Sequence, residues 1–306
     1  MNNLKLKEVL MGHTEDRIWY ASWSSDGNYL ATSGEDKVIR IWRIDNYECI
    51  STLEEGQNRT IRSCEWSPDN NLIASASFDG TVVVWESQNS SHSKWDIVAS
   101  LEGHENEVKS VCWNRAGNLL ATCGRDKRVW IWEKLEGFEF ECLAMLDGHS
   151  QDVKFVIWHP NFEILFSTSY DNSVKLWKED AGDWYCANTL EGHQSTVWNC
   201  CFNPSGDQML TSSEDKSIKL WVLIEPSSGL EWNIIQNIRD VHDHPVYSVS
   251  WNFFCNYVIS GGGDNKINLY LRDSNGINFV CDMKEAHESD INCLRYFKHI
   301  LLSIII

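Results

Sequence analysis

Basic residues are in short supply in this chain. Lys and Arg total 26 against 44 Asp and Glu, which gives a formal charge of -18 at pH 7. Proteins that bind nucleic acid rely on basic patches to hold the phosphate backbone, so this balance argues against nucleic acid as a direct partner. Proline is also scarce, with five residues, and glycine contributes 18. We therefore expect no long flexible linker between separate domains.

Long apolar runs are missing as well. No stretch approaches the ~18 apolar residues of a membrane-spanning helix, and residues 1–7 lack the apolar run of a secretory signal. The eleven cysteines are odd in number, scattered, and contain no Cys-x-x-Cys pair. These absences predict reduced thiols in a cytoplasmic or nuclear protein without a membrane partner. They also predict that the chain holds no metal and no cofactor, since buried free cysteine behaves as a small hydrophobe.

Tryptophan, in contrast, is abundant, with sixteen residues. Six aromatic residues recur at steps of 43 to 49 positions: Trp42, Trp85, Trp132, Trp177, Trp221 and Tyr270. We call these the terminal aromatics, because each closes one unit of the pattern. A recurrence of this length is the signature of a repeat architecture.

Other residue types keep fixed distances from the terminal aromatics. An Asp, which we call the turn Asp, lies six positions before each of them: Asp36, Asp79, Asp126, Asp171, Asp215 and Asp264. A hydroxyl residue lies four positions before each turn Asp: Thr32, Ser75, Thr122, Ser167, Thr211 and Ser260. A His lies 28 positions before four of the aromatics and 29 before Trp42, while Gln57 takes this place in the second repeat. Six registers of this kind do not arise by chance.

The segments between these fixed points predict short β-strands. Residues 108–113, 119–123 and 129–132 alternate or run apolar over strand lengths, and turn residues such as Pro68-Asp69-Asn70 separate the segments. We find no amphipathic helix pattern anywhere in the chain. The sequence therefore predicts an all-β protein.

With these features the chain resembles the WD-repeat β-propeller family over essentially its whole length. In that fold each repeat forms a four-stranded blade around a central channel. The resemblance implies a single propeller domain over residues 1–306, of the seven-bladed type, with six complete blades and a truncated seventh. The seventh repeat begins at His287 and lacks a turn Asp and a terminal aromatic. A strand over about residues 4–10 is expected to join this last, incomplete blade.

The resemblance also implies a buried hydrogen-bonded set of four residues in each repeat. A half-buried turn Asp needs donors, the His ring supplies one, and the Trp N–H needs an acceptor. The predicted structural sets are His104, Thr122, Asp126 and Trp132; His149, Ser167, Asp171 and Trp177; and His193, Thr211, Asp215 and Trp221. A His, a Ser and an Asp could suggest a hydrolase triad, but the set recurs in repeat after repeat and no Gly-x-Ser-x-Gly elbow is present. We therefore expect no catalytic residues and no enzyme.

Propeller geometry indicates which positions face a partner. These rim positions lie four and six residues before the aromatic residue of the innermost strand, where that strand begins, and one residue before the turn Asp. The candidate partner-binding residues are Arg62, Phe78, Lys109, Arg125, Lys154, Tyr170, Trp198 and Tyr247. Basic residues beside aromatic ones, on a protein this acidic, are typical of a binding hot spot. A solvated rim with ordinary charges is the competing interpretation. Trp19, Trp130 and Trp198 are the tryptophans for which the repeat predicts no packing role.

Several segments are more specific than the fold. Residues 101–111, 117–123, 151–154 and 195–198, together with Ser75-Ala76-Ser77-Phe78-Asp79, resemble the WD-repeat subunits of cytosolic iron–sulfur protein assembly targeting complexes. The likeness is densest from about residue 56 to 222. It implies a non-enzymatic scaffold, monomeric alone, that docks partner subunits and apoprotein clients and does not itself hold the cluster. Those partners are a small acidic subunit and a large helical-repeat subunit.

Two questions stay open at this point. Some relatives have Leu-Tyr-Arg where this chain has Leu176-Trp177-Lys178, so a contact with the cluster-transfer chaperone is undecided. A generic WD-repeat interaction scaffold, such as a ubiquitin-ligase substrate receptor, is the alternative function. No F-box-like helical segment precedes the first repeat, which weighs against that alternative.

Overall fold

The structure is a computed structural model that describes residues 4–13, 17–225, 227–252, 256–284, 286–297 and 300–305. The chain forms two compact units, one of Glu8–Trp158 and one of Met1–Lys7 with His159–Ile306. We call them the N-terminal unit and the C-terminal unit. In the described residues the regular structure is β-strand apart from one short 3₁₀ turn, Glu136–Phe138, and no helix is long and apolar enough to cross a bilayer.

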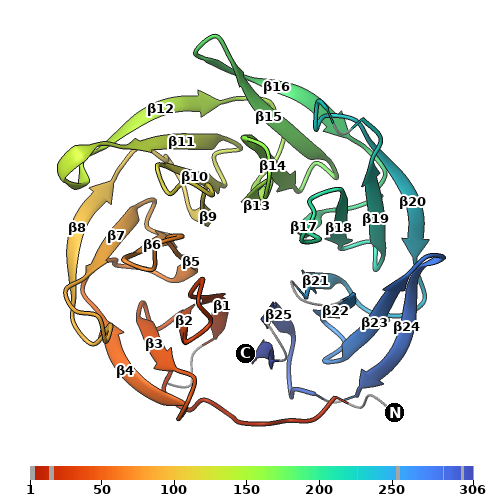
Figure 1. Cartoon of the computed structure of the whole chain (residues 1–306), viewed down its shortest axis with the longest axis horizontal. Coiled ribbons are helices and arrows are strands. Elements are labelled where there is room, and N and C mark those ends of the chain that lie inside the picture. Colours follow the sequence, from red (N-terminus) through yellow and green to blue (C-terminus); the bar gives the residue numbers. More distant parts are fainter. Residues whose placement is uncertain are drawn as a thin grey trace. The chain divides into compact units, whose positions relative to one another are not determined.

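The N-terminal unit contains three antiparallel four-stranded sheets in chain order. Its strands are β1 (Ile18–Trp23), β2 (Tyr29–Gly34), β3 (Ile39–Arg43), β4 (Glu48–Leu53), β5 (Ile61–Trp66), β6 (Leu72–Ser77), β7 (Val82–Ser87), β8 (Trp95–Leu101), β9 (Val108–Trp113), β10 (Leu119–Gly124), β11 (Val129–Lys134), β12 (Phe140–Leu146) and β13 (Val153–Trp158). Within this unit β1, β5 and β9 lie on the inner side and β4, β8 and β12 on the outer side (Figure 1). The strands predicted at 108–113, 119–123 and 129–132 are confirmed as β9, β10 and β11.

The C-terminal unit continues the same pattern. Its strands are β14 (Ile164–Ser169), β15 (Val174–Asp180), β16 (Asp183–Leu190), β17 (Val197–Phe202), β18 (Gln208–Ser213), β19 (Ile218–Leu223), β20 (Trp232–Ile238), β21 (Val246–Trp251), β22 (Tyr257–Gly262), β23 (Ile267–Asp273), β24 (Gly276–Met283), β25 (Ile291–Phe297) and β26 (Ile300–Ile305). Over the described part of both units the strands group into six four-stranded sheets and one two-stranded sheet, β25-β26.

The turn between the second and third strands has the same conformation in all six repeats. The residue after the turn Asp has a positive φ in each case: Lys37, Gly80, Lys127, Asn172, Lys216 and Asn265. Only one of these is Gly, so the left-handed conformation has a cost that something must offset. The turn Asp does so, because its carboxylate accepts the amide N–H two residues further on, as in Arg128 N to Asp126 Oδ1 at 3.2 Å. The side chain of the turn Asp therefore stabilises the turn between the second and third strands.

The fourth strand of every sheet carries a β-bulge opposite the terminal aromatic. Ladder registers shift next to Trp42, Trp85, Trp132, Trp177, Trp221 and Tyr270. In β20, for example, Trp221 faces Ile234 while the preceding Leu220 faces Gln236, which leaves Ile235 as the extra residue. A bulge bends a strand and increases its twist.

The core lies between successive sheets of each unit. In the N-terminal unit Leu72, Val84 and Trp113 belong to one buried cluster that joins the second sheet to the third. In the C-terminal unit Leu210 and Trp251 join two further sheets in the same way. Each sheet covers its neighbour, so no sheet has a stable hydrophobic face by itself.

The N-terminal segment differs from the expectation. Residues 4–10 form no strand, although Leu4 packs against the cluster of Ile291 and Leu294 in the C-terminal unit. A strand requires a ladder partner for its backbone, and none is paired with these residues in the described part of the chain. Near the end of the described chain, β25 and β26 pair as an antiparallel two-stranded ladder.

Candidate functional site

In two of the predicted four-residue sets, the four side chains form a continuous series of hydrogen bonds within the set. In the third repeat, Trp132 Nε1 donates to Thr122 Oγ1 at 3.0 Å, and Thr122 Oγ1 lies 2.8 Å from His104 Nε2. His104 Nδ1 then lies 2.6 Å from a carboxylate oxygen of Asp126. The fifth repeat has the same geometry, with distances of 2.9, 2.7 and 2.9 Å along Trp221, Thr211, His193 and Asp215.

The protonation of these sets follows from their partners. A carboxylate accepts, so His104 Nδ1 carries the proton and Nε2 accepts from the Thr122 hydroxyl, which leaves the hydroxyl oxygen for the Trp132 N–H. Burial alone would raise the pKa of Asp126, but the hydrogen bond and charge of His104 outweigh it and the pKa is lowered. Burial lowers the pKa of His193 despite the opposing Asp215 carboxylate. The lowered pKa favours the neutral form of the His193 imidazole at pH 7.

Other repeats vary this set. In the second, the Gln57 side chain replaces His, accepting from the Ser75 hydroxyl at 2.9 Å and donating to the Ser75 and Thr81 carbonyls. In the sixth, the Tyr270 hydroxyl replaces the Trp N–H and lies 2.9 Å from Ser260. Geometry is kept although the residue types change, so these sets hold the sheets together.

The remaining predicted set is divided between the two units. Trp177 donates to the Ser167 hydroxyl at 2.7 Å, and Asp171 accepts from Ser173, all in the C-terminal unit, while His149 is a buried residue of the N-terminal unit. In the tripeptide Leu176-Trp177-Lys178, Leu176 and Trp177 are buried, and only Lys178 has a partly exposed side chain.

In the first two repeats, the Gly before the repeat His or Gln is explained by the terminal aromatic. A Cβ on Gly56 would lie 2.3 Å from the ring of Trp85, and one on Gly12 would lie 2.6 Å from the ring of Trp42. In the third repeat the crowding atom belongs to Trp130, whose ring stacks on Trp132 at 5.4 Å. The expectation that Trp130 has no packing role is therefore wrong, because it extends the stack that covers Gly103.

The rim positions of the N-terminal unit carry interleaved charges. Arg125 and Arg59 both approach the carboxylate of Glu107, at 3.3 and 3.6 Å, and both arginine side chains are more than half exposed. Arg59 also donates to the Phe78 carbonyl at 2.7 Å. Arg125 therefore keeps an exposed guanidinium that is only loosely held by its own chain.

The two rim lysines differ from the arginines. Asp152 accepts from Lys109 Nζ at 2.5 Å and lies 3.5 Å from Lys154 Nζ, and the two lysine side chains are only 16% and 11% exposed. Burial, followed by repulsion from Lys109, lowers the pKa of Lys154 to about 8 against the opposing charge of Asp152. The exposed basic cluster predicted from the sequence is thus smaller than expected, because one carboxylate holds both ammonium groups inside the rim.

The aromatic rim positions lie in two places. Within the N-terminal unit, the Arg62 guanidinium lies over the Trp19 ring at 4.8 Å. Within the C-terminal unit, Trp198 and Tyr247 form a T-shaped pair with centroids 5.3 Å apart. Tyr170, also of the C-terminal unit, is 55% exposed.

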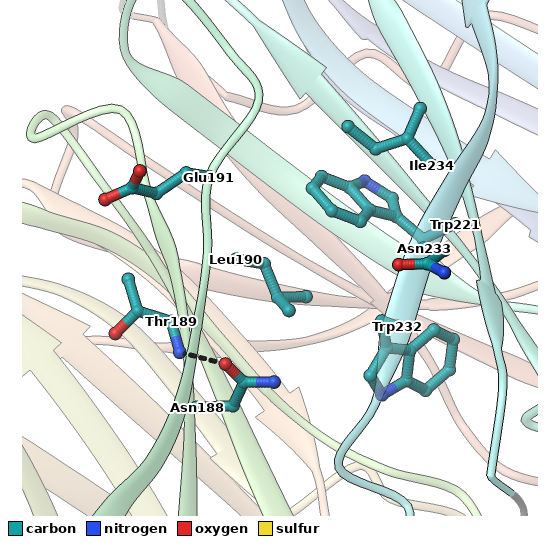
Figure 2. A pocket seen from close by; sticks show the side chains of 8 residues that line it. All are labelled: Asn188, Thr189, Leu190, Glu191, Trp221, Trp232, Asn233 and Ile234. Atoms are coloured by element: carbon teal, nitrogen blue, oxygen red, sulfur yellow. Dashed lines mark hydrogen bonds between the residues drawn. The ribbon is translucent and has the colours of Figure 1, made fainter.

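Two pockets lie at the outer strands of the sheets. A pocket of about 290 Å³ lies in the C-terminal unit, with Asn188–Glu191 on one wall and Trp221 and Trp232–Ile234 on the other (Figure 2). A similar pocket in the N-terminal unit is lined by Ser51–Glu55, Trp85 and Ser93–Trp95. Both occupy the groove between the outer strands of two successive repeats, so they belong to the repeat and mark no special site. Among the described residues no group of three or more His, Cys, Asp or Glu is arranged to hold a metal ion.

Comparison with known proteins gives two findings. The WD domain, G-beta repeat family matches residues 4–43, 47–86, 95–133, 140–178, 184–222 and 235–270. Similar curated proteins include the "Probable cytosolic iron-sulfur protein assembly protein" ciao1 of Danio rerio (41% identical over 61 residues), Ciao1 of Aedes aegypti (46% over 65) and protein 1 of Yarrowia lipolytica (43% over 60).

The relatives and the family model cover very different shares of the chain. Each relative aligns with 19–20% of this chain and 18–19% of its own length. The family match, in contrast, covers six segments that together span most of the chain, and each segment contains the first three strands, wholly or in large part, of one four-stranded sheet. The chain is all-β, and it belongs to the WD domain, G-beta repeat family, whose fold is the β-propeller.

Proposed function

We propose that this chain is a non-enzymatic scaffold that helps deliver iron–sulfur clusters to cytosolic and nuclear apoproteins. The observation that carries the proposal is its likeness to three proteins named for cytosolic iron–sulfur protein assembly. The structure supports a scaffold, since the repeated His and Asp side chains bond to one another inside the sheets. The cluster is the cargo of the pathway, held by other subunits.

The docking surface in this proposal is the rim. Arg125 and Tyr170 are its most exposed members, and Arg62, Phe78, Trp198 and Tyr247 are partly buried. Partly buried aromatic and Arg residues contribute most to protein interfaces, because they bury a large area at little entropic cost. Lys109 and Lys154 are mostly buried and contribute indirectly, because their ammonium groups hold the Asp152 carboxylate in place.

The proposal includes the wider assembly. The partners are a small acidic subunit, a helical-repeat subunit and apoprotein clients, and the chain is monomeric without them. The six repeats form one domain over residues 1–306, in which β25 and β26 are the first two strands of a seventh blade.

Affinity purification of the tagged chain tests the proposal. Iron–sulfur assembly subunits should copurify with the wild-type chain, and Arg125→Glu should reduce their yield at least tenfold, because a reversed charge repels an acidic partner. The exposed Arg125 pair with Glu107 is worth only ~0–1 kcal/mol, so the variant should fold. Arg128→Glu is the matched control: it makes the same change on the same turn, outside the rim positions, where Arg128 pairs with Asp147 at 2.9 Å.

Two outcomes contradict the proposal. Copurification of a cullin adaptor in place of iron–sulfur assembly subunits would favour the ubiquitin-ligase alternative. Equal loss of partners from the Arg125 and Arg128 variants would show that net charge, rather than this rim position, controls binding.

A further inference from the structure

Lys219 of β19, in the C-terminal unit, is a buried lysine without a partner. The residue is 4% exposed, and its Nζ forms no hydrogen bond or ion pair with the described residues. A Cβ built on Gly192 would lie 3.7 Å from Lys219 Cδ and 3.4 Å from the Trp221 ring, so the segment before His193 covers the aliphatic stem. Lys219 Nζ is not among the fully enclosed polar atoms that lack a partner. The ammonium group therefore reaches the surface from a buried stem.

Arg239 lies on the same face of this sheet. Lys219 pairs with Asn237 of β20, and residues two apart on a strand share a face. Arg239, two residues beyond Asn237, is therefore diagonal to Lys219, at a separation that long side chains can span. Arg239 is exposed and forms no ion pair with the described residues. Both charges act on the His193 imidazole, whose pKa is lowered first by burial and then by Lys219 and Arg239, against its hydrogen-bonded carboxylate.

The acid whose charge reaches Lys219 is already saturated with donors. Burial lowers the pKa of Lys219 and the charge of Arg239 lowers it further, although Asp215 opposes the shift. Both carboxylate oxygens of Asp215 are occupied, because they accept four hydrogen bonds of 2.6 to 3.0 Å, from the side chains of His193 and Ser217 and the backbone N–H groups of Gln194 and Ser217. Asp215 thus offsets one positive charge at a distance, and the pair of Lys219 and Arg239 keeps a net positive charge.

The preceding sheet of the same unit contains a compensated version of this pair. Lys175 of β15 pairs with Thr189 of β16 and donates to its hydroxyl at 2.8 Å. Glu191, two residues beyond Thr189, holds the diagonal position that Arg239 holds in the next sheet. The Glu191 carboxylate points away from Trp221 in Figure 2, so it does not turn toward the next sheet. Where β15 and β16 supply an acceptor and an acid to a lysine, β19 and β20 supply a second base.

We propose that Lys219 and Arg239 bind the carboxylate of an acidic side chain on a partner protein. A carboxylate brings the single negative charge that the pair lacks, and a guanidinium can hold it through two parallel hydrogen bonds. A phosphate group would bring nearly two charges and leave the site negative. Because burial already orders the Lys219 stem, binding costs less side-chain entropy there than at an ordinary surface lysine. The proposal rests on the scaffold function above and specifies the chemistry of one contact.

Lysine side-chain signals of the intact chain, labelled with ¹³C at the lysine Cε atoms, provide the direct test. The probe is the peptide acetyl-Gly-Glu-Gly-amide, and acetyl-Gly-Gln-Gly-amide, which keeps the shape without the charge, is the control. We expect the Lys219 signal, assigned with Lys219→Met, to shift to saturation with a millimolar dissociation constant for the Glu peptide. The Lys175 signal should stay in place, because its ammonium group already donates to Thr189.

Two variants measure the role of Arg239. Arg239→Gln should weaken binding of the Glu peptide about threefold, as the loss of a partly exposed ion pair does. Arg239→Glu, which copies the residue type of Glu191 in the preceding sheet, should abolish the shift of the Lys219 signal. Lys178→Gln is the matched control: it removes one positive charge from a partly exposed position of β15 and should leave the dissociation constant unchanged.

Three results would overturn the site: equal shifts with the Gln peptide, no shift of Lys219, or equal weakening by Arg239→Gln and Lys178→Gln. Saturation of the Lys219 shift by inorganic phosphate at a lower concentration than the Glu peptide would also refute a carboxylate and point to a phosphorylated partner. These measurements use no partner subunit, so their failure leaves the scaffold proposal intact if Arg125→Glu still loses its partners. Loss of only the scaffold result would leave a carboxylate site on a protein of different function.

Discussion

The hydroxyl of Thr122 is the point at which the buried set of the third repeat is most sensitive. Thr122 is fully buried, accepts from Trp132 at 3.0 Å and lies 2.8 Å from His104. Thr122→Val keeps the shape of the side chain and removes only the hydroxyl. Both the Trp132 N–H and His104 Nε2 then lose a partner at a buried position.

The size of the effect follows from these two groups. A buried polar group left unpaired costs about 1–3 kcal/mol, so the loss of two partners should lower the free energy of unfolding by about 2–6 kcal/mol. That is a large part of the ~5–15 kcal/mol that holds a typical domain together. Urea unfolding followed by circular dichroism at pH 7 gives the difference, provided that the slope of the transition is unchanged.

Thr168→Val is the matched control. Thr168 lies in β14, which is the second strand of its sheet as β10 is for Thr122. It is also fully buried, but its hydroxyl has no hydrogen-bond partner among the described residues. The same substitution there removes a group whose desolvation is not offset, so we expect a change between zero and about 1 kcal/mol in favour of the folded state. Equal destabilisation by both variants would refute the reasoning, because the cost would then come from packing alone.

Three further predictions concern other parts of the chain. Gly262→Ala should lower the free energy of unfolding by about 3 kcal/mol in urea titrations, because its Cβ would lie 1.9 Å from the carbonyl oxygen of Pro245; an unchanged midpoint would contradict this contact. Burial lowers the pKa of His287 to about 4, so its contribution is complete above about pH 6.5 and is lost as the pH falls toward 4, by about 3 kcal/mol in total. His287→Asn should flatten the fall of Tm over that interval, and an identical pH profile would show that His287 does not titrate on unfolding. Elemental analysis of the purified chain should find no stoichiometric iron or zinc, since the described residues hold no cluster of ligands; one metal per chain would overturn this expectation.

Spacing along the chain was enough to find the contacts that form within one repeat. His104, Thr122, Asp126 and Trp132 keep fixed separations because three consecutive strands of one sheet, and the segment leading into it, bring them together. Any change of spacing would break the set, so the sequence pattern carries the geometry. The same logic predicted the strands and their order.

Contacts between repeats leave no such pattern. Lys109 and Asp152 are 43 residues apart and meet only because neighbouring sheets of the N-terminal unit pack together. Their pairing depends on side-chain reach, so the sequence predicted two exposed lysines where the structure has an internal ion pair. The stacking of Trp130 over Gly103 escaped prediction for the same reason.

The bulge on each fourth strand has a consequence for solubility. The outer strands of four-stranded sheets are edges, and β20 and β24 place Ile234 and Phe279 in solvent. A regular edge with apolar side chains is a template on which strands of other molecules can add. In β20 the extra residue Ile235 divides the edge into two runs of three residues, which is too short for a stable foreign ladder. Six such interruptions therefore protect the periphery of the sheets from fibril growth, so that apolar outer side chains can persist without aggregation.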